Sequence, residues 1–173
     1  LRSLRWQQVD SARIEIIISD FGSSADCRPS IDSLALEHQA TVVVTDTNEV
    51  WNRSRALNIG IQASQAPWLL CTDVDMIFAP NFVSTILKTH HQSERLSMIH
   101  CDCLDLPSDL PLRAWDSQDY SRLHKSCVRR EVVATGACQS TCRSFFFYAQ
   151  GYDEKYTYWG HEDRDMTNRA QAY

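Results

Sequence analysis

Two acidic residues stand two positions apart in one of the most apolar stretches of the chain, LLCTDVDMIF, where they are Asp73 and Asp75. Taking a lone carboxylate out of water costs on the order of several kcal/mol, and two neighbouring carboxylates also repel each other. A shared divalent cation would offset both effects, and hard oxygen ligands favour magnesium or manganese over zinc. We therefore expect Asp73 and Asp75 to hold Mn²⁺ or Mg²⁺.

A cation held by one or two carboxylates usually completes its coordination with phosphate oxygens and water. The sequence therefore also predicts a phosphate-bearing ligand. The chain contains neither a Walker-type glycine loop nor a Gly-x-Gly-x-x-Gly pattern. The phosphates must then be held by the cation and by scattered side chains.

The composition describes a single soluble domain. The chain has 173 residues, 43% of them apolar, and a formal net charge of -5, and this length is enough to bury one core. Its basic residues are scattered apart from Arg129 and Arg130, which argues against a nucleic-acid partner. No apolar run approaches the roughly 20 residues of a membrane span, and the N-terminal stretch lacks the apolar centre of a signal peptide. We expect a cytoplasmic chain whose membrane association, if any, depends on parts outside this sequence.

Short apolar or β-branched runs alternate with helical patterns along the chain. Strands are predicted at residues 14–18, 41–44, 68–71 and 96–99, and helical spacing at residues 31–38, 56–63 and 82–87. This order predicts an α/β fold in which a mainly parallel central sheet, joined by right-handed crossovers, is flanked by helices. A further helix is expected at residues 163–172.

Three polar clusters follow expected strands or precede a helix, at residues 19–24, 73–75 and 158–163. Ligands of open α/β sheets bind outside the carboxyl ends of the strands, so the three clusters together predict a ligand site. Taken singly, each also has a purely structural interpretation: a turn, two loop carboxylates, or acids that complement a helix dipole. Residues 102–130 lose the alternating pattern, and they are either a functional excursion from the sheet or a disordered loop.

The seven cysteines show no framework spacing. Two pairs, Cys101 with Cys103 and Cys138 with Cys142, are close enough in sequence to suggest a zinc site. Free thiols, mostly buried, are the simpler interpretation and the one we favour.

Four motifs occur in the order found in one enzyme family. They are IEIIISDFGSSAD at residues 14–26, WNRSRALNIG at residues 51–60, TDVDMIFAPNF at residues 72–82, and GACQSTCRSFFFYAQGYDE followed by YWGHEDRDMTNR within residues 136–169. Together they resemble nucleotide-sugar-dependent glycosyltransferases with the A-type fold, in particular family 2 enzymes and the galactosyltransferase-like group. The resemblance extends from the first of these motifs to the end of the chain.

The resemblance implies a UDP-sugar donor and assigns the donor side of the site. Asp20 matches the acidic position that recognises the uracil base, although Phe21 stands where a second acid is often found. Asp75 is expected to ligate the cation directly, whereas Asp73 contacts the ribose or reaches the cation through water. The arginine and asparagine of the second motif, Arg55 and Asn58, are expected near the nucleotide.

On the acceptor side the resemblance implies an inverting transfer, in which a general base removes the proton of the acceptor hydroxyl. Asp163 is the expected base. Glu162 is the second candidate, or else a ligand of the acceptor hydroxyls. Trp159 is expected to stack on a sugar face, and Gly136 begins the acceptor-side block, to which the excursion at residues 102–130 contributes.

These expectations define one domain over residues 1–173 that transfers a sugar from a UDP-sugar to a saccharide or glycan acceptor, as in polysaccharide biosynthesis. Relatives usually begin with an additional strand and continue into a segment with a further metal-ligating His, so we expect a fragment that lacks both. Two other functions stay open. One is a nucleotidyltransferase that acts on a sugar phosphate, and the other is a non-catalytic module that binds nucleotide sugars.

Overall fold

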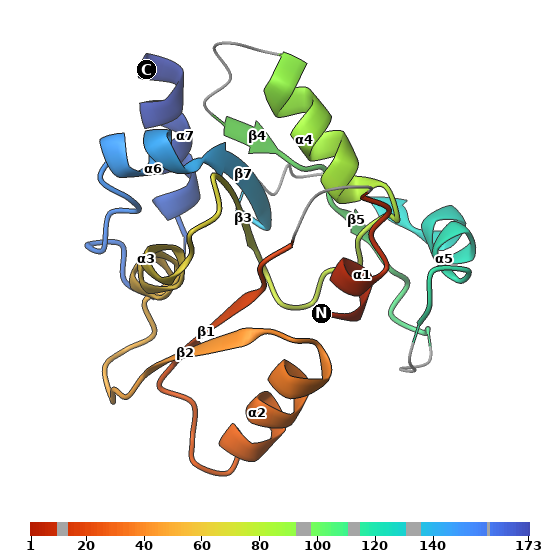
Figure 1. The fold of residues 1–173 in the computed structure, drawn as a ribbon, viewed down its shortest axis with the longest axis horizontal. Helices are drawn as coiled ribbons and strands as arrows, with labels where there is room; N and C mark the ends of the chain where they lie inside the picture. The colour runs from red at the N-terminus through yellow and green to blue at the C-terminus, as the bar shows by residue number, and fades with distance from the viewer. Residues whose placement is uncertain (10–13, 93–97, 111–114, 131–135, 159) are drawn as a thin grey trace. The chain divides into compact units, whose positions relative to one another are not determined.

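The computed structural model describes residues 1–9, 14–92, 98–110, 115–130, 136–158 and 160–173 (Figure 1). The chain forms two compact units. The first unit comprises residues 1–12 and 70–140, and the second unit comprises residues 13–69 and 141–173. Two of the three boundaries between them fall within strands, β3 (Trp68–Thr72) and β7 (Cys138–Cys142).

The second unit begins with a β-α-β arrangement. Strands β1 (Ile17–Phe21) and β2 (Thr41–Thr45) are parallel. Helix α2 (Arg28–Glu37) makes the crossover between them and has a proline in its first turn, where the missing N–H has no intrahelical partner to lose. Helix α3 (Arg53–Ala63) then packs against β1.

Helix α3 lies close to β1 because a glycine faces the strand. A Cβ atom at Gly60 would lie 3.2 Å from the Cβ atom of Ser19, and Ser19 Oγ donates to the Ala56 carbonyl at 2.6 Å. Asn52 caps the helix, since its side chain accepts the Arg55 N–H at 2.9 Å. The beginning of α3, which carries the second sequence motif, is therefore fixed against β1.

Two further helices complete the second unit, α6 (Arg143–Tyr148) and α7 (Glu162–Ala172). Phe145, Phe146 and Met166 supply core side chains that are 2%, 3% and 0% exposed. Helix α7 confirms the helix predicted at the end of the chain.

In the first unit, helix α4 (Phe82–Gln92) and strand β4 (Met98–His100) follow β3. The sheet has the strand order β3-β7-β4. The short helix α1 (Arg2–Arg5) leads into Gln7, whose Oε1 accepts the Val83 N–H at 2.9 Å and so holds the start of α4.

Residues 102–130 carry three short elements where the structure describes them. These are β5 (Leu104–Asp105), α5 (Tyr120–Ser126) and β6 (Val128–Arg129), and β5 pairs antiparallel with β6. The described part of the excursion is therefore folded rather than a structureless loop. Residues 111–114 lie outside the described residues.

The predicted α/β order is confirmed. The four predicted strands are all present, although β1 begins at Ile17 rather than at residue 14, and residues 96–97 lie outside the described residues. β1 and β2 are parallel as predicted, whereas β5 and β6 are antiparallel. A mainly parallel central sheet and a single domain over the whole chain stay predictions.

The longest helices of the described residues, α3, α4 and α7, have 11 residues each. In that part of the chain, no helix is both long and apolar enough to cross a membrane.

Candidate functional site

Asp73 and Asp75 lie on the turn that follows β3, and both residues are exposed. Val74 between them is 97% exposed. The Asp73 N–H donates to the Ala137 carbonyl at 3.0 Å, which ties the turn to the residue before β7. The expectation that burial makes this pair of carboxylates costly is wrong, because the chain leaves the core as soon as β3 ends. Exposed carboxylates are instead directly accessible to a cation.

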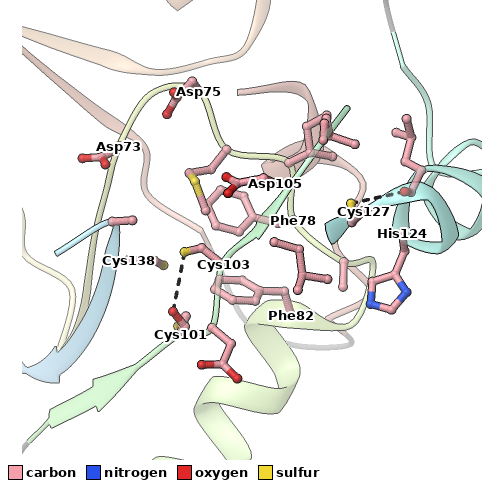
Figure 2. A pocket seen from close by; sticks show the side chains of 18 of the residues that line it. Asp73, Asp75, Phe78, Phe82, Cys101, Cys103, Asp105, His124, Cys127 and Cys138 are labelled. Atoms are coloured by element: carbon pink, nitrogen blue, oxygen red, sulfur yellow. Dashed lines mark hydrogen bonds between the residues drawn. The ribbon is translucent and has the colours of Figure 1, made fainter. Parts of the chain in front are cut away.

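A pocket of about 560 Å³ opens beside this turn within the first unit (Figure 2). Its polar lining includes four aspartates and an arginine, namely Asp73, Asp75, Asp102, Asp105 and Arg130. Apolar side chains and thiols form much of the rest, among them Phe78, Phe82, Leu123, Cys101, Cys103, Cys127 and Cys138. The volume of the pocket lies within the range of small-molecule sites.

Arg130 brings positive charge to the acidic side of the pocket. Its Nε donates to Asp105 Oδ1 at 2.7 Å. This hydrogen bond is the main reason that the pKa of Arg130 is raised, and the negative charge of Asp75 adds a smaller effect. A guanidinium suits phosphate oxygens, so the pocket offers carboxylates to a metal cation and a fixed positive charge to a phosphate.

The pocket acids fit a hard divalent cation that takes most of its ligands from elsewhere. Among the residues that the structure describes, no three His, Cys, Asp or Glu side chains are grouped so as to hold a metal ion. Magnesium and manganese sites commonly use one or two carboxylates and complete the shell with phosphate and water. Asp73 and Asp75 therefore fit such a cation together with a phosphate-bearing ligand.

In the second unit, Asp20 lies near the carboxyl end of β1 and is 4% exposed. Its Oδ1 accepts the Ser23 N–H at 3.2 Å, and its Oδ2 lies 3.1 Å from Arg28 Nη2. The Arg28 charge stabilises the buried carboxylate. Oδ2 nevertheless has no hydrogen bond within the described part of the chain, so this oxygen keeps the capacity to accept an N–H from a ligand.

Asn58 holds the segment that carries the Gly-Tyr-Asp-Glu motif. Its side chain accepts the Tyr152 N–H at 2.9 Å and donates to the Tyr152 carbonyl and to Glu154 Oε1, both also at 2.9 Å. Gly151 has φ of +73°, and a Cβ atom there would lie 2.8 Å from Asn58 Oδ1. Asn58 therefore positions this segment, and its expected place near a nucleotide stays a prediction.

Arg55 stands beside an aromatic pair at the start of α3. Its Nη1 lies 2.5 Å from Glu49 Oε2, and its guanidinium is 5.8 Å from the centre of the Phe21 ring. The Phe21 and Trp51 rings meet edge to face with centres 5.7 Å apart. The side chain of Arg55 is 38% exposed, so it can contact a ligand, and that contact stays a prediction.

Glu162 and Asp163 are consecutive, but the structure gives them different surroundings. Glu162 begins α7 with a side chain that is 5% exposed, and its Oε1 accepts a hydrogen bond from Arg53 Nη1 at 3.0 Å. Asp163 is only half-buried. It lies in the first turn of α7, where the helix dipole stabilises a carboxylate. Glu162 is therefore engaged by Arg53, while Asp163 keeps access to solvent.

The turn before α7 has left-handed backbone conformations at Tyr158, Gly160 and His161, with φ of +75°, +102° and +74°. Such values are uncommon for residues other than glycine and are found at functional sites. The Tyr158 N–H donates to the Trp51 carbonyl at 2.9 Å, which ties the turn to the residue before the α3 cap. This hydrogen bond thus fixes the backbone of the turn that leads to Asp163.

Two predicted acceptor residues have little structural context. Trp159 lies outside the described residues. Gly136 is half-buried in the first unit, next to Ala137, whose carbonyl accepts the Asp73 N–H. Their roles toward an acceptor stay predictions.

The chain matches the model of one known protein family. The model of glycosyl transferase family 2 matches residues 1–157. The chain belongs to this family. Membership in glycosyl transferase family 2 confirms the resemblance seen in the four motifs, and together with the α/β architecture it supports the A-type glycosyltransferase fold.

One solved structure similar to this family 2 chain is a mutant of the Drosophila β-1,4-galactosyltransferase 7 in complex with manganese, UDP-Gal and xylobiose. The identity is 13% and the TM-score 0.42, and the alignment covers 92% of this chain and 62% of that chain. The chain therefore spans less than two thirds of that structure's length. No curated protein matches the present chain.

Sequence reasoning missed three arginines of this glycosyl transferase family 2 chain, Arg28, Arg53 and Arg130. Each pairs with an acid, respectively Asp20, Glu162 and Asp105. Arg53 was within reach, because it lies in the same motif as Arg55. No local sequence pattern indicated the ion pairs of Arg28 and Arg130, because the fold brings each arginine to its partner acid.

Proposed function

We propose that this chain is the catalytic domain of a metal-dependent, inverting glycosyltransferase that moves a sugar from a UDP-sugar to a saccharide acceptor. The observation that carries the proposal is the position of Asp73 and Asp75 in a family 2 chain. Both acids are exposed directly after β3 and line a pocket of about 560 Å³.

On the donor side, Asp75 and Asp73 would hold Mn²⁺ or Mg²⁺. When bound, the cation would supply Lewis-acid stabilisation to the departing diphosphate. Arg130 offers a further positive charge on the same pocket wall. Asp20 is proposed to accept the imide N–H of uracil, which is supported by the lack of a hydrogen bond to its Oδ2 within the described residues. Arg55 and Asn58 are proposed to lie near the nucleotide.

On the acceptor side, Asp163 is the proposed general base. A base must be ionised, and the first turn of α7 favours the charged carboxylate. The engagement of Glu162 with Arg53 favours a supporting role for Glu162 over proton transfer. Trp159, Gly136 and the excursion at residues 102–130 are proposed to contact the acceptor sugar.

The deciding experiment is product analysis. The chain would be incubated with manganese and a panel of UDP-sugars, with and without oligosaccharide acceptors, and UDP release and glycan mass would be measured. Metal-dependent transfer to an acceptor supports the proposal, and inversion of the anomeric centre can be assigned from the product by NMR.

The two alternatives are tested by separate assays. A nucleotidyltransferase would release diphosphate from a nucleoside triphosphate and a sugar phosphate, with no glycan product. A binding module would show metal-dependent UDP binding by calorimetry without turnover. Either result would replace the proposed activity.

A further inference from the structure

Two cysteines bracket the excursion of the first unit. Cys101 directly follows β4, and Cys138 is the first residue of β7. These strands are neighbours in the sheet, and the Cys101 N–H donates to the Cys138 carbonyl at 3.1 Å. The residue before the excursion and a residue that follows it on β7 are therefore adjacent.

The two thiols contact each other. Their side chains form a hydrogen bond, which is the main cause of both the lowered pKa of Cys101 and the raised pKa of Cys138. The lowered pKa makes Cys101 the more readily ionised thiol of the pair. Cys101 is partly exposed and lines the pocket, whereas Cys138 is 0% exposed. An accessible thiolate beside a buried second thiol is the arrangement of an attacking and a resolving cysteine.

The spacing of the strands suits a covalent bond. Neighbouring strands of a sheet lie about 4.7–4.9 Å apart in the hydrogen-bonding direction, and a disulfide usually spans about 4.4–6.8 Å between Cα atoms. All seven cysteines are free in the structure. Only Cys71 and Cys138 are buried, so the expectation of mostly buried thiols is wrong, because several of them line the open pocket.

The other thiols of the pocket are directed to backbone atoms. Cys103 Sγ donates to the Cys101 carbonyl at 3.6 Å and Cys127 Sγ to the Leu123 carbonyl at 3.2 Å (Figure 2). Burial also raises the pKa of both Cys103 and Cys127, so neither of them is favoured over Cys101 as the attacking thiol. Cys101 and Cys138 are therefore the pair best placed to react.

We propose that Cys101 and Cys138 form a dithiol that a small disulfide, such as oxidised glutathione, converts to a protein disulfide across the base of the excursion. The Cys101 thiolate attacks one glutathione sulfur, which forms a mixed disulfide and expels one glutathione thiolate. Cys138 then loses its proton and attacks the Cys101 sulfur, which expels the second glutathione. Two thiols are oxidised, and one glutathione disulfide is reduced to two glutathione molecules.

The disulfide would form beside the part of the pocket lining that includes Asp73 and Asp75. Ala137, next to Cys138, accepts the Asp73 N–H at 3.0 Å. Oxidation would therefore join the two ends of the excursion beside the turn of Asp73 and Asp75. Formation of the disulfide itself does not depend on any transferase activity.

The test is peptide mapping of the whole chain after incubation with oxidised glutathione and blocking of the remaining thiols. Trypsin places Cys101 and Cys103 on the peptide of residues 96–113 and Cys138 and Cys142 on that of residues 131–143. The expected product joins these peptides, is lighter by two hydrogens than their sum, and separates on reduction. Fragment ions should assign the bond to Cys101 and Cys138.

Matched variants make the result decisive. Cys103→Ala and Cys142→Ala should keep the cross-link, whereas Cys138→Ala and Cys138→Ser should stop at a glutathione adduct on Cys101. Circular dichroism would establish that each variant is folded, and glutathione addition to the exposed Cys27 would show that the oxidant is active. A bond from Cys101 to Cys103 or Cys127, or a modified Cys27 with Cys101 and Cys138 both still reduced, would overturn the proposal.

Discussion

Arg53 Nη1 and Glu162 Oε1 are 3.0 Å apart, and their side chains are only 11% and 5% exposed. The contact joins the first residue of α3 to the first residue of α7. Removing one partner of a buried ion pair leaves the other charge buried and uncompensated. This costs more free energy than the intact pair contributes to stability. Glu162 is therefore required for the local structure, whatever its role toward a ligand.

The two acids of the turn should give different phenotypes. Glu162→Gln leaves Arg53 without its carboxylate and should lower the free energy of unfolding by about 3–5 kcal/mol. Asp163→Asn should leave stability nearly unchanged and lower kcat by ~10²–10⁴-fold, because it removes the proposed base. Denaturant unfolding and acceptor titrations would measure the two effects. Near-normal turnover in Asp163→Asn would exclude it as the base.

Asn58 should matter for stability more than its size suggests. Asn58→Ala leaves the N–H and carbonyl of Tyr152 without their partner, and each unsatisfied buried group costs about 1–3 kcal/mol. Thermal unfolding should show a clear loss relative to Asn48→Ala, which changes an exposed asparagine. Equal melting temperatures for the two variants would show that the Asn58 hydrogen bonds are not needed to hold Tyr152.

Asp75 should be required for metal-linked nucleotide binding. Asp75→Ala removes one of two proposed ligands and should abolish the manganese dependence of UDP affinity in calorimetry. Asp75 is exposed, so the fold should be unaffected. Asp109→Ala, an exposed acid outside the pocket lining, is the matched control. Manganese-dependent UDP binding that survives in Asp75→Ala would remove Asp75 from the cation site.

Asp20 should discriminate the base rather than the phosphates. Asp20→Ala and Asp20→Asn should both weaken UDP more than inorganic diphosphate, because only UDP carries the uracil imide. Both variants also remove the charge that pairs with Arg28, so circular dichroism should first establish that each is folded. Competition binding with both ligands would measure the ratio, with exposed Asp26→Ala as the control. Equal losses for UDP and diphosphate would contradict base recognition.

Acid should destabilise the first unit through His90. This histidine is 4% exposed, and its Nε2 lies 2.9 Å from Ser140 Oγ. Burial, and then the charge of His91, lowers the pKa of His90 from 6.5. The unfolded chain therefore takes up the proton first, so stability is present above about pH 6.5 and is lost as the pH falls below it.

The histidine effect can be isolated by difference. The melting temperature of the chain should fall on acidification, and His90→Gln should remove part of that fall. His124→Gln, which changes an exposed histidine, should keep it. An acid response identical in all three proteins would assign the effect to other groups.

The sequence predicted most of the elements because their patterns are local. The β-branched run at Thr41–Thr45 and the Asn52 cap before α3 each depend on a few neighbouring residues. The surroundings of Asp73 and Asp75 were misjudged, because the apolar run that surrounds them in sequence does not surround them in space. The pairings of Arg28 and Arg130 were missed for the same reason, since tertiary contacts bring each of them to its acid.

Gly151 and Asn58 impose a constraint on each other. Gly151 has a left-handed φ, and any side chain there would meet Asn58 Oδ1 at 2.8 Å. A substitution at residue 151 is therefore tolerated only if residue 58 also changes and another group takes over the Tyr152 backbone. In a comparison of related sequences the two positions should covary, and in a saturation mutagenesis screen Gly151 should be among the least replaceable residues of the second unit.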